Sequence, residues 1–341
     1  MNSKSICYVA AVVVALLWLQ PSCKRTNPEN SAKPAVNGLR GCSGYTPYDS
    51  FSMLWARGGE DRKMVWVSSG GEAGRLLVSK ADPSKRPDWA LCTQGVVAGL
   101  AARGEDVVII GTTFISDEAI VPVFRLPRKN LSGARSLFIP RSSIEFAFDH
   151  LLAREGVSRE SVSLPKVEKL DFSTVVSLLG KPATDADSLD FAILVDPFVS
   201  NMLKDHPGQY EVGKGGLYEM HYCIVARRED VSAKRDQFVN LLKQFAAIGK
   251  TLDVIKTDEE FRQTVWGREK GGQPERLPEM VTFSRKPLHL QMNVTALRER
   301  LREEHSYLTK KYPGELQMPQ DIDRLVDPSL LLEAAPEGVA K

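Results

Sequence analysis

Two short apolar runs with polar ends frame a small-residue helix pattern between residues 89 and 113. In WALCTQGVVAGLAARGEDVVIIGTT the first run stops at Thr93-Gln94 and the second at Thr112-Thr113. Apolar runs of this length, separated by a helix, are typical of buried strands in a parallel α/β sheet. Because both runs end in side chains that hydrogen-bond, the stretch also predicts a polar ligand site beyond the strand ends.

Strand and helix patterns alternate from Leu39 onward, which favours an α/β fold. The run AIVPVFRL contains Pro122, so it is expected to be an edge or connecting strand. The patterns form two βα groups, before and after about residue 127, and a mostly helical tail with an apolar face. The candidate strands are LRGCSG, MVWVSS, DWALCT, EDVVIIGTT, AIVPVFRL, LFI at 137–139, LDFAILVDPF and HYCIVARRE.

The N-terminus has the pattern of an export signal. A short start with one Lys precedes the apolar run Ile6 to Leu19, which is shorter than the roughly 20 residues of a spanning helix. Ser22 before Cys23 resembles the bacterial lipoprotein signal, although Gln20 and Pro21 depart from it. We expect a signal peptide at 1–22, lipidation at Cys23, a polar tether at 23–35 and a location in the cell envelope, periplasmic or extracytoplasmic. An ordinary cleaved signal and an uncleaved anchor remain alternatives.

Composition argues against several functional classes. The chain has 45 basic and 43 acidic residues and a net charge of +2, which gives no electrostatic case for nucleic acid. No histidine pair has metal-ligand spacing, and neither a P-loop nor a G-x-S-x-G motif is present. We therefore expect no metal, no cofactor and no enzymatic activity. Cys42, Cys92 and Cys223 lie at apolar positions and are expected to be buried, and their pairing stays open.

Residues at the carboxyl ends of the predicted strands, and at the helix starts that follow, form the candidate ligand site. They are hydroxyls and amides with one aromatic ring and one carboxylate. Thr93, Gln94 and Ser142 have a simpler alternative role as helix caps. The candidate ligand-binding residues are Tyr45, Thr46, Thr93, Gln94, Thr112, Ser142, Ser143 and Asp196.

Four segments, taken in order, resemble the substrate-binding proteins of bacterial ABC importers of the nitrate/sulfonate/taurine/thiamine-pyrimidine type. They are GYTPYDSFSMLWAR, DWALCTQGVVAGLAARGEDVVIIGTT, LSGARSLFIPRSSIEFAFDHLLAREGVSRESV and LDFAILVDPF. The resemblance covers roughly residues 36 to 335. It implies a type II periplasmic-binding-protein fold: two lobes, each a mixed sheet flanked by helices, with a ligand cleft between them. Lobe one would comprise 36–121 with 227–335, lobe two 127–221, and the crossing strands 122–126 and 222–226.

The resemblance also implies a function. Closure of the lobes would capture a small polar or heterocyclic molecule for the permease subunits of an ABC importer, and we expect a monomer. Many relatives have a Trp-Glu-Pro-like stretch where this chain has Val195-Asp196-Pro197, and the pocket lacks an obvious Arg besides Arg141. A neutral or cationic heterocycle against Tyr45 and Asp196 is therefore as plausible as sulfonate or nitrate. A binding module of a membrane sensor and an exported enzyme on the same fold are the alternatives.

Overall fold

The structure is a computed structural model that describes residues 38–44, 47–59, 61–168, 170–196, 198–265, 288–314 and 321–340. The predicted signal peptide, the tether with Cys23, and the candidate site residues Tyr45 and Thr46 lie outside these described residues. Within them, no helix is both long enough and apolar enough to cross a membrane.

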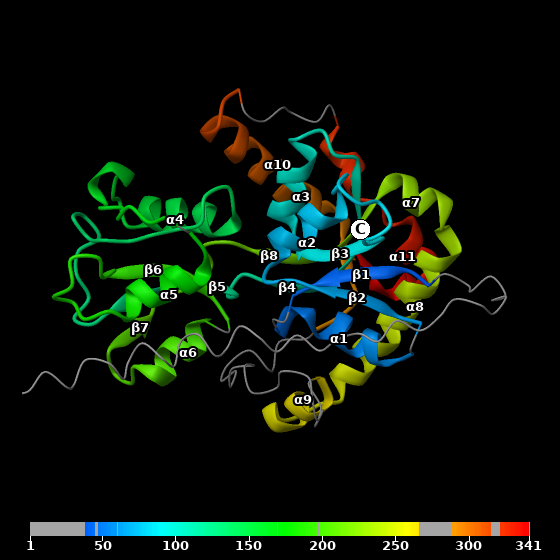
Figure 1. Cartoon of the computed structure of the whole chain (residues 1–341), viewed down its shortest axis with the longest axis horizontal. Helices are drawn as coiled ribbons and strands as arrows, with labels where there is room; N and C mark the ends of the chain where they lie inside the picture. Colours follow the sequence, from blue (N-terminus) through cyan, green and yellow to red (C-terminus); the bar gives the residue numbers. More distant parts are fainter. Residues whose placement is uncertain are drawn as a thin grey trace, which may run out of the picture. The chain divides into compact units, whose positions relative to one another are not determined.

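The larger of the two main sheets has five strands in the order β2-β1-β3-β8-β4. β1 pairs in parallel with β2 and β3, and β8 runs antiparallel to both β3 and β4. The sheet is therefore mixed, as predicted (Figure 1). Its strands are β1 (Arg40–Ser43), β2 (Lys63–Trp66), β3 (Trp89–Thr93), β4 (Val107–Ser116) and β8 (Met220–Arg227).

The smaller sheet has the order β6-β5-β7 and is antiparallel throughout. Its strands are β5 (Ile120–Arg125), β6 (Phe191–Val195) and β7 (Tyr210–Val212). A short parallel pair, β9 (Met292–Asn293) and β10 (Val339–Ala340), lies near the C-terminus. The predicted strand at 137–139 is not a strand: this segment is held beside β6 by single contacts, such as the Ser136 hydroxyl donating to the Phe191 carbonyl at 2.9 Å.

Helices surround both sheets, with α4, α5 and α6 around the smaller one (Figure 1). A 3-10 turn at Pro47–Asp49 precedes α1. Asp49 does not cap α1, because its carboxylate is engaged elsewhere. The helices are α1 (Ser50–Arg57), α2 (Gly70–Leu77), α3 (Gln94–Ala101), α4 (Ser143–Arg154), α5 (Phe172–Gly180), α6 (Phe198–Asp205), α7 (Arg228–Ala233), α8 (Arg235–Asp253), α9 (Asp258–Val265), α10 (Val294–Lys311) and α11 (Ser329–Ala334).

The two segments expected to cross between lobes each lie inside one sheet. Residues 122–126 overlap β5 of the small sheet, and residues 222–226 belong to β8 of the large sheet. The chain passes between the sheets at 117–119 and again at 213–219. A hydrogen bond of 2.8 Å from the Gly216 amide to the Asp117 carbonyl joins these two crossing segments.

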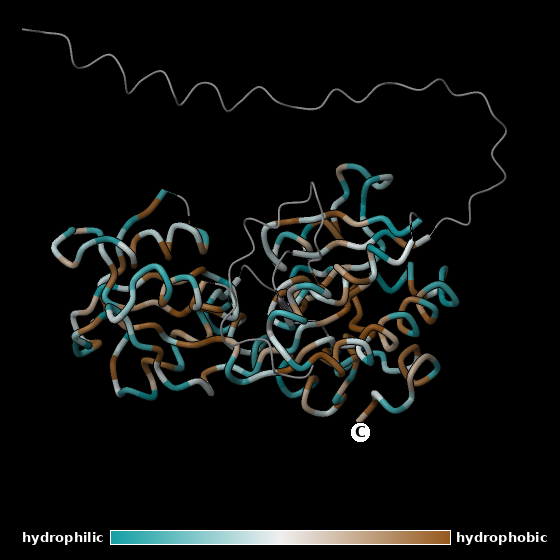
Figure 2. Tube along the Cα trace, turned by 90° about the horizontal axis from the view of Figure 1, so that it is seen from below, coloured by the Kyte–Doolittle hydropathy of each residue, from teal (hydrophilic) through white to brown (hydrophobic). Residues whose placement is uncertain are grey.

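The buried apolar residues form two clusters, and the larger one extends from the large sheet to Phe124 and Phe191 of the small sheet. The large sheet packs aromatic rings edge to face, with Trp89 5.3 Å from Trp55 and 5.5 Å from Phe245. Gly41 permits this packing, because a Cβ there would lie 2.3 Å from the Trp89 ring. The small sheet buries aliphatic residues such as Leu179 and Leu194. Figure 2 shows the apolar segments running through the interior and polar segments in the outer loops, as burial of apolar surface requires.

Candidate functional site at the junction of the two sheets

Gln94 fixes the second crossing segment to the large sheet. It is the first residue of α3, it is fully buried, and its side-chain amide donates to the Glu219 carbonyl at 2.7 Å. Its Oε1 accepts from the His221 amide at 2.8 Å. The sequence predicted Gln94 as a ligand contact, but its hydrogen-bonding groups are used to hold the backbone of the crossing segment.

Glu304 brings a buried carboxyl group from α10 into the same place. It accepts a hydrogen bond of 2.6 Å from the Tyr218 hydroxyl, and the Gln94 side chain lies close by. Burial raises its pKa from 4.5 to about 8, so the carboxyl is protonated at neutral pH. Gly95 leaves room for it, because a Cβ at that position would lie 2.3 Å from Glu304 Oε2.

Ser143 completes this group from the other lobe. Its side chain, at the start of α4, lies close enough to the Tyr218 hydroxyl to lower the pKa of that hydroxyl. We call Gln94, Ser143, Tyr218 and Glu304 the junction cluster. It connects α3 and α10 beside the large sheet, α4 beside the small sheet, and the crossing segment between them. Burial and the neighbouring Glu304 raise the pKa of Tyr218, so its hydroxyl keeps its proton.

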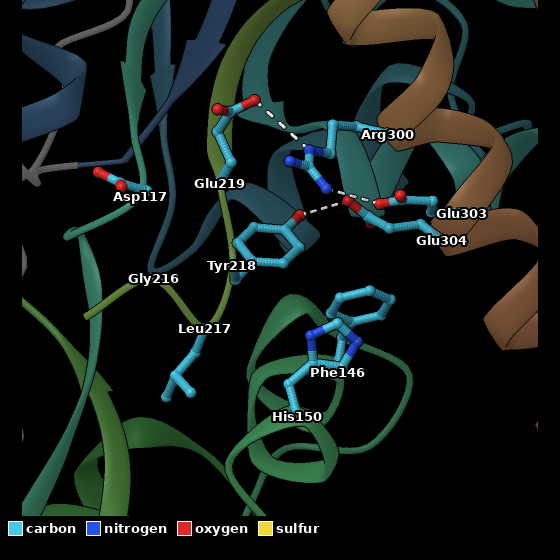
Figure 3. A pocket seen from close by; sticks show the side chains of 10 residues that line it. All are labelled: Asp117, Phe146, His150, Gly216, Leu217, Tyr218, Glu219, Arg300, Glu303 and Glu304. Carbon is cyan, nitrogen blue, oxygen red and sulfur yellow. Dashed lines mark hydrogen bonds and ion pairs between the residues drawn. The ribbon is translucent and has the colours of Figure 1, made fainter. Parts of the chain in front are cut away.

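A pocket of about 220 Å³ opens beside the junction cluster (Figure 3). Arg300 on α10 pairs with Glu303 at 2.7 Å and with Glu219 at 3.4 Å. The Phe146 ring lies edge-on to Tyr218 at 5.6 Å, and the His150 ring lies 4.2 Å from Phe146, tilted by 37°. We call this space the junction pocket. Its lining residues are Asp117, Phe146, His150, Gly216, Leu217, Tyr218, Glu219, Arg300, Glu303 and Glu304.

A second polar group lies at the carboxyl end of β1. Asp49 Oδ1 accepts hydrogen bonds from the Ser43 hydroxyl at 2.5 Å, the Gly44 amide at 3.1 Å and the Tyr222 hydroxyl at 2.8 Å. The Tyr48 ring lies 5.8 Å from that of Tyr222. Burial, and after it the charge of Asp196, raises the pKa of Tyr48, which places Asp196 of the small-sheet lobe close to this group.

The remaining predicted site residues have different local roles. Thr93 is half-buried at the end of β3, and its side chain makes no cap hydrogen bond to α3. Thr112 lies inside β4, fully buried, and its hydroxyl donates to the Gln291 carbonyl at 2.5 Å. Ser142 caps α4 by accepting from the Ile144 amide at 3.2 Å. Asp196 Oδ1 accepts from the Ser200 hydroxyl at 2.7 Å.

None of the six predicted site residues that the structure describes lines the junction pocket, although Gln94 and Ser143 lie beside residues that do. A sequence signal for Glu304 exists. It lies on the buried stripe of α10 together with Leu297, Leu301 and Leu308, where helical spacing predicts an apolar residue. Tyr218 gives no such signal, because it lies in an irregular crossing segment. Within the described residues, no group of His, Cys, Asp and Glu is arranged to hold a metal ion.

Two mixed α/β lobes connected by two crossing segments define the two-lobed periplasmic-binding-protein fold, as the sequence resemblance predicted. The structure is similar to the alkanesulfonate-binding protein SsuA from Xanthomonas axonopodis pv. citri bound to MOPS, with a TM-score of 0.65, 16% identity, and coverage of 87% of this chain and 99% of that one. It is also similar to the periplasmic aliphatic sulphonate binding protein SsuA from Escherichia coli, with a TM-score of 0.64, 15% identity, and coverage of 86% and 93%.

The periplasmic nitrate-binding protein NrtA from Synechocystis PCC 6803 is a third neighbour, with a TM-score of 0.64, 12% identity and coverage of 90% of each chain. No family model and no curated protein matches the sequence. These identities establish a shared fold. The ligands named for these neighbours are known for those proteins and are not assigned to this chain.

Proposed function

We propose that this chain is an exported solute-binding protein that captures a small polar or heterocyclic molecule and delivers it to an ABC importer. One observation carries the proposal: the likeness to SsuA from Xanthomonas axonopodis extends over 99% of that binding protein, so both lobes and both crossing segments are present. In this fold, a solute held between lobes favours the closed arrangement, and binding with closure is all that delivery requires. Lipid attachment at Cys23 would keep the protein beside its permease.

A thermal-unfolding screen of the full chain tests solute capture. Sulfonates, nitrate, pyrimidines, polyamines and flavin-like heterocycles are compared, because a ligand that binds only the native state stabilises it by about 2.7 kcal/mol at a hundred times its Kd. We expect one class to raise the Tm. Thr93→Val should reduce that shift, while Thr251→Val on the exposed face of α8 should not. If no solute raises the Tm, solute capture is contradicted. If Thr93→Val and Thr251→Val change the Tm shift equally, the strand-end site is contradicted.

Membrane fractionation tests the anchor separately. The unaltered chain should sediment with membranes, and Cys23→Ser should release it. If the Cys23→Ser chain remains in the membrane fraction, lipidation at this residue is excluded, and solute capture is unaffected by that result.

A further inference from the structure

The junction pocket carries an excess of negative charge. Among its lining residues, the carboxylates of Asp117, Glu219 and Glu303 face a single guanidinium, that of Arg300. Arg300 already pairs with both glutamates, at 2.7 and 3.4 Å. The Asp117 carboxylate has no hydrogen-bond or ion-pair partner among the described residues. An anion would therefore enter against this charge, whereas a cation would be attracted by it.

The walls suit a cation that also has an apolar part. The rings of Phe146 and Tyr218 stand edge-on 5.6 Å apart, and aromatic faces attract ammonium groups while they cover alkyl carbons. Burial and the neighbouring Tyr218 hydroxyl fix the Glu304 carboxyl in the same wall, where it adds a hydrogen-bonding group. The pocket thus combines carboxylates from three segments with an aromatic wall, which is the chemistry that recognises organic amines.

We propose that the junction pocket binds a small organic cation with primary ammonium groups, in contact with α4, α10 and the second crossing segment. A volume of about 220 Å³ equals roughly seven water molecules of liquid, which suits a chain of about six heavy atoms. Since the lining residues come from both lobes, an occupant would also favour the arrangement of α4 and α10 seen here. The site is additional to solute capture at the strand ends, because none of the predicted strand-end residues within the described part of the chain lines it.

Calorimetric titration of the full chain at low ionic strength tests the proposal. The probe is 1,4-diaminobutane, and the matched controls are 1,4-butanediol, which has the same length without charge, and butanedioate, which has the opposite charge. We expect the diamine alone to bind. The variant with Asp117→Asn and Glu303→Gln should weaken binding about fivefold to tenfold, as loss of two partly exposed charges predicts. Glu299→Gln removes one carboxylate charge at an exposed position of α10 outside the pocket, and it should leave binding unchanged.

Three outcomes would overturn the proposal: equal binding of the diol, equal weakening by Glu299→Gln, or no heat of binding with the diamine. Thr93→Val separates this site from the strand-end site. If Thr93→Val abolishes diamine binding while the Asp117 and Glu303 changes do not, the cation is the captured solute at the strand ends, and the junction pocket is not its site. If the diamine fails to bind while another solute raises the Tm, only this inference fails.

Discussion

The Tyr218 hydroxyl donates a 2.6 Å hydrogen bond to the Glu304 carboxyl, and this contact joins the second crossing segment to α10. Both residues are buried, with Gln94 of α3 and Ser143 of α4 beside them. The second crossing segment is therefore held by hydrogen bonds from α3 and α10. Because Glu304 is titratable, its contribution to the free energy of unfolding can be measured as a function of pH.

Glu304→Gln should remove a pH dependence of stability. The native pKa of about 8 lies above the unfolded value of 4.5, so the native chain retains a proton that the unfolded chain has released. The free energy of unfolding therefore falls as the pH rises from about 4.5 to 8. At pH 5 the Glu304→Gln variant and the unaltered chain should unfold at similar urea concentrations. At pH 8.5 the variant should be the more stable of the two, by on the order of 3 kcal/mol. Parallel stability curves for the two chains from pH 5 to 8.5 would contradict this assignment.

Glu145 should show the opposite pH dependence. Burial alone would raise its pKa, but hydrogen bonds from Tyr312 at 2.6 Å, the Arg141 amide at 2.7 Å and Arg159 at 2.9 Å hold the pKa below its ordinary value. The Glu145 carboxylate therefore stabilises the fold above the pKa it has in the unfolded chain. This stabilisation is lost as the pH falls through the lower pKa of the native chain. Glu145→Gln should cost about 1–3 kcal/mol at pH 7, and the difference from the unaltered chain should disappear toward pH 3 in urea titrations. A difference that stays constant with pH would show that only packing is lost.

Two glycines of α3 should respond in opposite ways to alanine. A Cβ at Gly95 would meet Glu304 Oε2 at 2.3 Å, whereas one at Gly99 would meet only the Arg103 Nη1 atom at 4.0 Å. Gly95→Ala should destabilise the fold by about 1–3 kcal/mol, and Gly99→Ala should stabilise it by about 0.5–1 kcal/mol through helix propensity. Denaturant midpoints give both values. The cost of Gly95→Ala should shrink when Glu304→Ala is also present, and simple additivity would exclude the clash as its cause.

Tyr222→Phe should destabilise the group around Asp49. The Tyr222 hydroxyl donates to Asp49 Oδ1 at 2.8 Å, and the carboxylate is fully buried. Removal of one donor from a buried charged acceptor costs about 1–3 kcal/mol. Tyr307→Phe is the matched control, because its hydroxyl donates to the more exposed Asp149 at 2.7 Å and its loss should cost less. Equal losses in thermal unfolding would argue against a special role for the buried acceptor.

The sequence pattern predicted the fold class and most of the strands, because buried strands such as β3 and β6 are short apolar runs with clear ends. It failed at 137–139, where an apolar segment is held by isolated side-chain bonds instead of a ladder. The segments expected to cross between the lobes, 122–126 and 222–226, overlap β5 and β8 instead. Their apolar character reflects burial in a sheet, and periodicity does not reveal which sheet a strand joins.

The candidate site was less predictable. Thr112 resembles a strand end because Gly111 precedes it, yet β4 continues to Ser116 and the Thr112 hydroxyl bonds Gln291 far along the chain. Gln94 was expected at a helix start, and α3 begins there, but the partners of its amide depend on tertiary structure. Ligand contact by each of the eight candidate residues stays a prediction.

The position of β8 between β3 and β4 has a consequence for synthesis on the ribosome. β4 is complete at residue 116, but its ladder partner begins only at Met220, after the whole small sheet has been made. The small sheet is built entirely from residues 120–212, so it can fold while the edges of β3 and β4 are still exposed. A chain interrupted between residues 213 and 219 would therefore hold a finished small lobe beside an open sheet edge, which is the form most prone to aggregate or to attract a chaperone.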